Sequence, residues 1–204
     1  MSDHTLKIAI SGPNASGKTT LANAISERYR IPVLEEGVAQ IFNSQAVFDK
    51  LRHERAPVNE LVQAKTAWID AFSRWTENRA LAYEKNPGFV ADRWEADLLD
   101  FWLVLMRNEK NVDQLTVKFA KNLRARAKML DLVIVMPFGA PFSREKNDAD
   151  IARATTLANR LLNTMITTGI IHTLPDVRVL RIPPTVLSVG ERLALIEKSL
   201  SGAR

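Results

Sequence analysis

The eight residues from 12 to 19 constrain this chain more than any other segment. Their sequence, Gly-Pro-Asn-Ala-Ser-Gly-Lys-Thr, matches the pattern G-x-x-x-x-G-K-[ST] at every fixed position. An apolar run over residues 6–10 precedes them, and apolar residues at helical spacing follow over residues 18–30. Glycines allow such a loop to turn tightly, so that successive backbone N–H groups and the start of the helix surround phosphate oxygens. The pattern therefore predicts a strand, a phosphate loop (residues 12–19) and a helix that together bind a nucleotide.

Each residue of the phosphate loop has an expected task. Lys18 is expected to bridge the β- and γ-phosphates, and Thr19 to bind Mg²⁺. The ligand predicted on this basis is ATP with Mg²⁺. The predicted nucleotide-binding residues are Gly12, Pro13, Asn14, Ala15, Ser16, Gly17, Lys18, Thr19 and Thr20.

Apolar runs and helical patterns alternate along the whole chain. The predicted strands cover residues 6–10, 31–34, 89–91, 132–136 and 177–182. The predicted helices cover residues 18–30, 38–48, 58–85, 94–106, about 112–129 and 148–168, and a last helix opens at the S-x-x-E capping box of residues 188–191. Residues 52–57 are predicted to form a loop. This alternation indicates an α/β fold with a mostly parallel sheet and helices on both faces, and 204 residues suit a single domain.

Composition excludes several classes of protein. The chain has no cysteine and three scattered histidines, which rules out disulfides and cysteine nucleophiles and argues against a histidine-based metal site. No apolar run approaches the ~18 residues of a membrane span. The N-terminus lacks the basic start and apolar stretch of a signal peptide. We therefore expect a cytoplasmic protein without a membrane partner, in the host cytoplasm if a phage encodes it.

Acidic residues at strand ends narrow the function further. The chain contains no N-K-x-D segment, which argues against a GTPase. The fourth predicted strand ends without an acidic residue, whereas the third ends at Asp92. Asp92 is therefore the best candidate for the acid near Mg²⁺ or near an acceptor hydroxyl. Glu35 and Glu36 follow the second predicted strand in the same way.

On these residues the sequence resembles the P-loop nucleoside and nucleotide kinases, the group that contains the ribosylnicotinamide kinase domain, the deoxynucleoside kinases and the thymidylate kinases. The resemblance rests on G-P-N-A-S-G-K-T-T-L, on Glu35-Glu36, on Asp92-Arg93 and on the arginine-containing segment 144–153. It spans nearly the whole chain. It implies a three-layer P-loop NTPase fold with a five-stranded sheet of order 2-3-1-4-5, so that the ends of strands one, two and three converge. It also implies transfer of the γ-phosphate of ATP to a hydroxyl of a nucleoside or nucleotide.

The resemblance assigns roles to residues at these strand ends. Lys18 would stabilise the phosphoryl group during transfer, and Asp92 would serve as a catalytic acid group and as a metal ligand beside Thr19. Glu35 is the second catalytic candidate, and which of Glu35, Glu36 and Asp92 acts as base stays open. The residues expected to bind the acceptor are Glu36, Arg93 and Trp94.

The resemblance also implies two larger parts and a base-side loop. A helical region over about residues 38–86 is expected to bind the acceptor. A lid over about residues 138–155 would bring Arg144 and Arg153 over the phosphates, with Lys146 and Arg160 in reserve, because arginine binds phosphate oxygens in pairs. Phe142-Ser143 stands where ribosylnicotinamide kinases have Asp-Gly, which argues against nicotinamide riboside as the acceptor. The loop after the last strand, residues 182–185, commonly borders the adenine in this fold.

The remaining patterns leave the acceptor open. Trp68, Phe72 and Trp75 recur on one side of a helix, which favours a core position over a base-stacking one. Residues 107–130 hold seven basic and two acidic residues. Four of the basic residues share one helical face, which is either a solvated face or a surface for the phosphate backbone of DNA. These four are Lys118, Lys121, Arg124 and Lys128.

Three hypotheses follow. The first is a kinase for a free nucleoside or nucleotide. The second is a kinase for a hydroxymethylated pyrimidine within DNA, as in some bacteriophage kinases that resemble this group; it alone predicts steep salt-dependent DNA binding. The third is an ATP-binding switch or accessory ATPase whose nucleotide state controls a partner. The oligomeric state is left open by the sequence.

Overall fold

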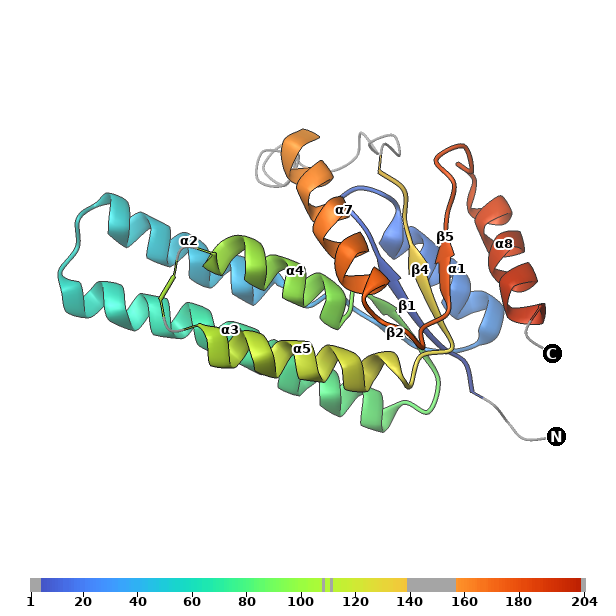
Figure 1. Cartoon of the computed structure of the whole chain (residues 1–204), viewed down its shortest axis with the longest axis horizontal. Coiled ribbons are helices and arrows are strands. Elements are labelled where there is room, and N and C mark those ends of the chain that lie inside the picture. The colour runs from blue at the N-terminus through green and yellow to red at the C-terminus, as the bar shows by residue number, and fades with distance from the viewer. Residues whose placement is uncertain (1–4, 108, 111, 139–156, 203–204) are drawn as a thin grey trace. The chain divides into compact units, whose positions relative to one another are not determined.

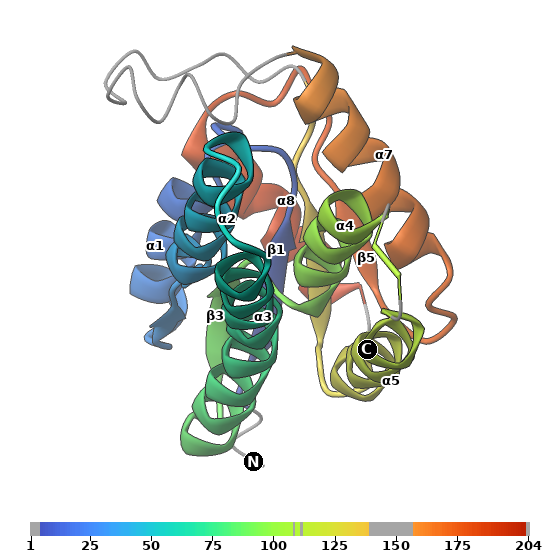
Figure 2. The same cartoon turned by 90° about the vertical axis from the view of Figure 1, so that its left-hand side faces the viewer.

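The structure, a computed structural model, describes residues 5–107, 109–110, 112–138 and 157–202. Its Cα positions form two compact units. Unit 1 comprises residues 1–35 and 87–204, and unit 2 comprises residues 36–86. Figure 1 labels the elements of both units except β3, which is labelled in Figure 2.

Unit 1 is built on a five-stranded sheet. Its strands are β1 (Lys7–Ser11), β2 (Val33–Leu34), β3 (Phe89–Asp92), β4 (Leu132–Val135) and β5 (Val179–Arg181). All four neighbouring pairs are parallel, and the strand order is β2-β3-β1-β4-β5. The predicted α/β class and the order 2-3-1-4-5 are therefore confirmed. In this order β2, β3 and β1 lie side by side, so their carboxyl ends meet at one edge of the sheet.

Helices cover both faces of the sheet in unit 1. They are α1 (Lys18–Tyr29), α4 (Glu95–Met106), α5 (Asp113–Ala127), α7 (Leu157–His172) and α8 (Val189–Ser201). On one face α1 packs against α8, and on the other α4 packs against α5 and α7 (Figure 2). The capping box predicted at residues 188–191 is present, with the hydroxyl of Ser188 accepting from the backbone N–H of Glu191 at 3.2 Å. The predicted three-layer arrangement is thus present.

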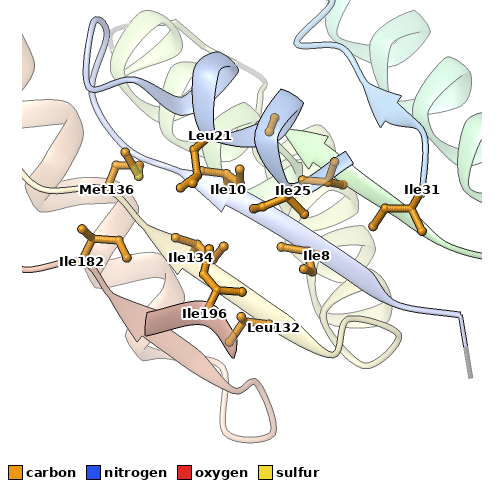
Figure 3. Packing of buried hydrophobic residues seen from close by; sticks show 12 residues of the cluster. Ile8, Ile10, Leu21, Ile25, Ile31, Leu132, Ile134, Met136, Ile182 and Ile196 are labelled. Carbon is orange, nitrogen blue, oxygen red and sulfur yellow. The ribbon is translucent and has the colours of Figure 1, made fainter. Parts of the chain in front are cut away.

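The alternation of side chains along β1 separates an apolar face from a polar one. Ile8 and Ile10 join residues of α1 and α8 in a fully buried apolar core (Figure 3). Ser11 lies on the opposite side, because successive side chains of a strand point to opposite faces. It is also fully buried and hydrogen-bonds to α4. On β3, Val90 belongs to the same core as Ile8 and Ile10, so Asp92 shares the face that α1 covers.

Unit 2 consists of α2 (Ala39–His53) and α3 (Val58–Lys85). The predicted core stripe of α3 is confirmed, since Trp68, Phe72 and Trp75 are all buried, and Trp68 stacks on Phe48 of α2 with ring centroids 5.6 Å apart. The helix predicted over residues 38–48 ends later than expected, because α2 continues to His53. Its last turn carries basic residues that favour a helix C-terminus, and an i,i+4 contact between Lys50 and Glu54 at 3.9 Å supports it.

None of the helices in the described ranges has both the length and the apolar character needed to cross a membrane. The predicted helix 148–168 is described only from Leu157, and it continues to His172. The predicted lid, at residues 138–155, lies outside the described residues except for Phe138.

Candidate active site

The phosphate loop joins β1 to α1 through residues with positive φ angles. Gly12 has φ 142° and Gly17 has φ 85°, and Ala15 between them has φ 57°. At Gly12 a Cβ atom would lie 2.7 Å from the Cβ atom of Met136, closer than side chains tolerate. Glycine is therefore required at residue 12 both by its backbone angle and by the neighbouring chain.

Lys18 lies against the phosphate loop. Its side chain is buried, and Nζ donates a hydrogen bond to the carbonyl oxygen of Pro13 at 2.9 Å. The ammonium group thus lies against the phosphate loop, which it contacts at Pro13. A cation in this place, next to the N-terminus of α1, attracts phosphate oxygens.

Thr19 and Asp92 form the first contact between the loop and β3. The hydroxyl of Thr19 donates to Oδ2 of Asp92 at 2.6 Å, and Asp92 is 2% exposed. The other oxygen, Oδ1, is buried and has no hydrogen-bond partner among the described residues. A buried polar atom without a partner is costly, and it marks a place where a ligand is expected.

This pair fits a magnesium ion. Mg²⁺ takes oxygen ligands and is usually held by one or two protein groups together with substrate phosphates and water. Thr19 offers a hydroxyl oxygen, and Asp92 offers a carboxylate oxygen that the described residues leave unpartnered. The described part of the chain contains no group of three His, Cys, Asp or Glu residues that could hold a metal by itself. Thr19 and Asp92 together offer two oxygen ligands, which suits an ion bound jointly with nucleotide phosphates.

Arg93, the residue after β3, contacts the phosphate loop. Its Nη1 donates to the carbonyl oxygen of Gly12 at 3.3 Å and to Oδ1 of Asp97 at 3.1 Å, and its Nη2 donates to Oδ1 of Asn14. The side chain is 4% exposed, and its guanidinium lies 5.0 Å from the ring centroid of Phe101. Arg93 was predicted to bind the acceptor. The structure places its guanidinium on the phosphate loop.

Asp97 connects Arg93 to the end of β1. Its Oδ2 accepts a hydrogen bond from the hydroxyl of Ser11 at 2.7 Å, and that hydroxyl accepts one from Nε1 of Trp94 at 2.7 Å. Burial raises the pKa of Asp97, and the charges of Arg93 and Lys18 oppose the shift. Trp94, another predicted acceptor residue, is fully buried with its indole N–H bound to Ser11. These side chains form a buried polar network beneath the phosphate loop.

The two glutamates after β2 fall in different units. Leu34 pairs with Ala91, so Glu35 and Asp92 each follow a paired position on neighbouring parallel strands. The exposed Glu35 thus lies at the same sheet edge as Asp92. Glu36 belongs to unit 2, where its carbonyl oxygen accepts from Nε1 of Trp75 at 2.8 Å.

The remaining predicted site residues lie partly inside and partly outside the described ranges. Thr20 is an exposed residue of α1. Arg144, Arg153 and Lys146 lie outside the described residues. Arg160 is a buried residue of α7, with its guanidinium 5.9 Å from the ring centroid of Phe138 after β4.

Two residues at the site were missed by the sequence analysis. Asp97 lies in the first turn of α4, where it accepts from the backbone N–H of Trp94 at 3.4 Å, and an acidic residue at a helix start is a signal that the sequence offers. Arg192 donates from Nη1 to the carbonyl oxygen of Ser16 at 3.4 Å. No local pattern indicates this contact, because 176 residues separate its partners.

The geometry defines a class of protein. A phosphate loop after β1, a helix that starts at its lysine, and an aspartate at the end of the adjacent strand β3 together describe a P-loop NTPase.

The comparisons make the class more specific. The model of the family described as "AAA domain" matches residues 7–174, and the chain belongs to that family. No curated protein matches the sequence. Among solved structures, deoxyadenosine kinase from M. mycoides with bound dCTP is similar at TM-score 0.66 and 16% identity, over 97% of this chain and 100% of that chain.

Two further solved structures have the same fold. Thymidylate kinase from Candida albicans is similar at TM-score 0.54 and 12% identity, over 99% of this chain and 93% of that chain. The YorR protein from Bacillus subtilis, in complex with phosphorylated GDP, is similar at TM-score 0.51 and 10% identity, over 97% of this chain and 98% of that chain. The fold is therefore that of the P-loop nucleoside and nucleotide kinases, as the resemblance implied.

Proposed function

We propose that the protein is an ATP-dependent kinase that transfers the γ-phosphate to a hydroxyl of a nucleoside- or nucleotide-type acceptor. The observation that carries the proposal is the pair of Thr19 and Asp92, a hydroxyl and a buried carboxylate with an unpartnered oxygen, directly beside Lys18. The fold adds support, because deoxyadenosine kinase and thymidylate kinase share it. The cofactors of this proposal are ATP and Mg²⁺.

The residues of unit 1 have distinct tasks in this reaction. The backbone N–H groups of the phosphate loop and Lys18 hold the β- and γ-phosphates. Bound Mg²⁺, with Thr19 and Asp92 as its protein ligands, would neutralise charge on the phosphate oxygens. The acceptor oxygen bonds to the γ-phosphorus as the bond from that phosphorus to ADP breaks. Its proton goes to a carboxylate, for which Glu35, Glu36 and Asp92 are the candidates.

Other parts of the chain complete the proposal. The resemblance implies acceptor-binding residues in each unit: Glu36 at the start of unit 2, and Arg93 and Trp94 in unit 1, where both are buried. Arg93 would also hold Gly12 and Asn14 in place, in keeping with its contacts. The lid arginines Arg144 and Arg153 would stabilise the transferring group, since a planar guanidinium binds phosphate oxygens in pairs.

The test is transfer of label from γ-labelled ATP to a panel of acceptors. The panel contains nucleosides, nucleoside monophosphates and duplex DNA with and without hydroxymethylated pyrimidines, with an acceptor-free control. Lys18→Ala should abolish transfer, whereas Lys198→Ala, which changes an exposed lysine of α8, should not. Normal turnover in the Lys18 variant would overturn the proposal. Phosphate release without a labelled acceptor would instead support an accessory ATPase.

A second candidate function is phosphorylation of a modified base within DNA, and one surface favours it. Four cations, three on α5 and one at its C-cap, are exposed on the side opposite the buried Phe119 and Leu123. No carboxylate of the described residues forms an ion pair with them. The four are Lys118, Lys121, Arg124 and Lys128.

Salt dependence separates this candidate from the first. If all four cations contact DNA phosphates, the logarithm of the DNA affinity should fall with the logarithm of the salt concentration with a slope of about −3 to −4. Changing Lys121 and Arg124 to Glu should weaken binding and flatten the slope, while Lys198→Glu should do neither. A wild-type protein that does not bind DNA at low salt would eliminate this candidate and leave the first intact.

A further inference from the structure

Arg192 joins the phosphate loop to the loop that follows β5. It lies early in α8, and its side chain is 6% exposed. Its Nη1 donates to the carbonyl oxygen of Ser16 at 3.4 Å, and its Nε donates to the carbonyl oxygen of Val186 at 3.2 Å. One planar guanidinium thus contacts the phosphate loop and Val186, the residue after the segment 182–185 that is expected to border the adenine.

The guanidinium lies against the phosphate loop at the peptide between Ser16 and Gly17. A Cβ atom at Gly17 would stand 3.0 Å from Nη1 of Arg192, so the glycine leaves room for this approach. In a planar trans peptide the carbonyl oxygen and the following N–H point in opposite directions. Holding the carbonyl of Ser16 toward Arg192 therefore directs the N–H of Gly17 away from Arg192. That N–H is one of the loop donors expected to bind phosphate.

We propose that Arg192 is a positioning residue for the donor nucleotide, which orients the Gly17 N–H toward the phosphates by holding the carbonyl of Ser16. The proposal rests on the proposed nucleotide binding, and it concerns the phosphates rather than the acceptor. Burial lowers the pKa of the guanidinium, so this cation is held in the interior against a desolvation cost. Its hydrogen bonds to two separate loops offset that cost.

The test compares a ligand with a base and a ligand without one. Isothermal titration measures the affinities of Mg·ATP and Mg·tripolyphosphate for the wild type, Arg192→Gln, Arg192→Lys and Arg28→Gln. The Arg28 variant is the control, because Arg28 ties α1 to Glu197 of α8 at 2.8 Å without a contact to the phosphate loop. Arg192→Gln should bind both ligands roughly tenfold more weakly, since a charged hydrogen bond is lost. The affinities of Arg192→Lys should lie between those of the wild type and of Arg192→Gln, because lysine keeps the positive charge but lacks the planar guanidinium with its two hydrogen-bonding ends.

Kinetics adds a readout that a general loss of stability would not produce. In the Gln variant the KM for ATP should rise, while the KM for the acceptor stays unchanged. If that variant fails to fold, the Lys variant carries the comparison, with melting temperatures measured for both.

Three results would overturn the inference. Unchanged affinities in both Arg192 variants would show that the contact does not position the loop. Weaker binding of ATP with unchanged binding of tripolyphosphate would show that Arg192 acts on the part of the site that binds the base and not on the phosphates. An equal loss in Arg28→Gln would show that loosening α8 is sufficient. A wild type that binds neither ligand would contradict the proposed function itself, which distinguishes the two failures.

Discussion

The buried ion pair of Arg93 and Asp97 makes a quantitative prediction about stability. The two side chains are 4% and 2% exposed, and their N···O distance is 3.1 Å. Breaking a buried pair by changing one partner typically costs about 3–5 kcal/mol, because the remaining charge stays buried without compensation. In Asp97→Asn one carboxylate oxygen becomes an N–H₂ group, so either Arg93 or Ser11 loses its acceptor. We expect the free energy of unfolding to fall by about 3 kcal/mol.

The assay is urea unfolding followed by circular dichroism, with Arg28→Gln as the control. The pair of Arg28 and Glu197 has a shorter N···O distance, 2.8 Å, but its side chains are 61% and 42% exposed. An exposed pair contributes about 0–1 kcal/mol, so the control should lose far less stability than the Asp97 variant. Equal losses in the two variants would refute the claim that burial decides the magnitude.

A double variant then separates stability from nucleotide binding. Replacing Arg93 with Met and Asp97 with Leu removes both buried charges, a change that often preserves stability. It also removes the hydrogen bonds from Arg93 to Gly12 and Asn14. We expect most of the lost stability to return while ATP affinity stays low. Recovery of both would show that the network supports the fold without arranging the loop.

Three further predictions follow from single residues. Asp92→Asn should lower phosphoryl transfer, leave ATP binding nearly intact and raise the Mg²⁺ concentration needed for half-maximal rate; collapse of ATP affinity would instead assign Asp92 to the fold. Burial raises the pKa of Asp100 to about 7, so its protonated form stabilises the fold at low pH, and this contribution is lost as pH rises to about 7. Between pH 5 and pH 8 the free energy of unfolding should fall by roughly 3 kcal/mol in the wild type and by less in Asp100→Asn, as measured by urea unfolding. Gly12→Ala should lower the melting temperature, because its Cβ would meet Met136 at 2.7 Å, whereas Gly169→Ala in α7, with nothing within 4 Å, should raise stability by up to about 1 kcal/mol.

The parts of the fold that were predicted correctly follow from patterns within short stretches of sequence. The phosphate loop is a contiguous motif, and the apolar stripe of α3 repeats within one helix, so both are visible in a short window of sequence. The strand order came from the resemblance to a family, and the pairing of β1 with both β3 and β4 confirmed it. The end of α2 was misplaced because a charged run was interpreted as a loop, although such residues are compatible with a helix.

Side-chain direction was harder to predict than the elements themselves. Asp92 and Arg93 are adjacent, yet Asp92 contacts Thr19 of α1 and Arg93 contacts Asp97 of α4. The alternation of β3 separates them, and the positive φ of Arg93, 66°, ends the strand there. A dipeptide motif does not encode which face each residue takes. Arg192 was beyond prediction for a different reason, since only the packing of α8 on α1 brings it to the loop.

Three side chains from separate parts of the fold hold the phosphate loop in place. Met136 after β4 packs against Gly12, Arg93 after β3 binds Gly12 and Asn14, and Arg192 of α8 binds Ser16. Each contacts backbone atoms or a loop side chain rather than the place expected for phosphate. A loop held in this way loses little conformational freedom when a nucleotide binds, and that lowers the cost of binding. Loss of one anchor should therefore weaken the affinity for any triphosphate, whatever its base.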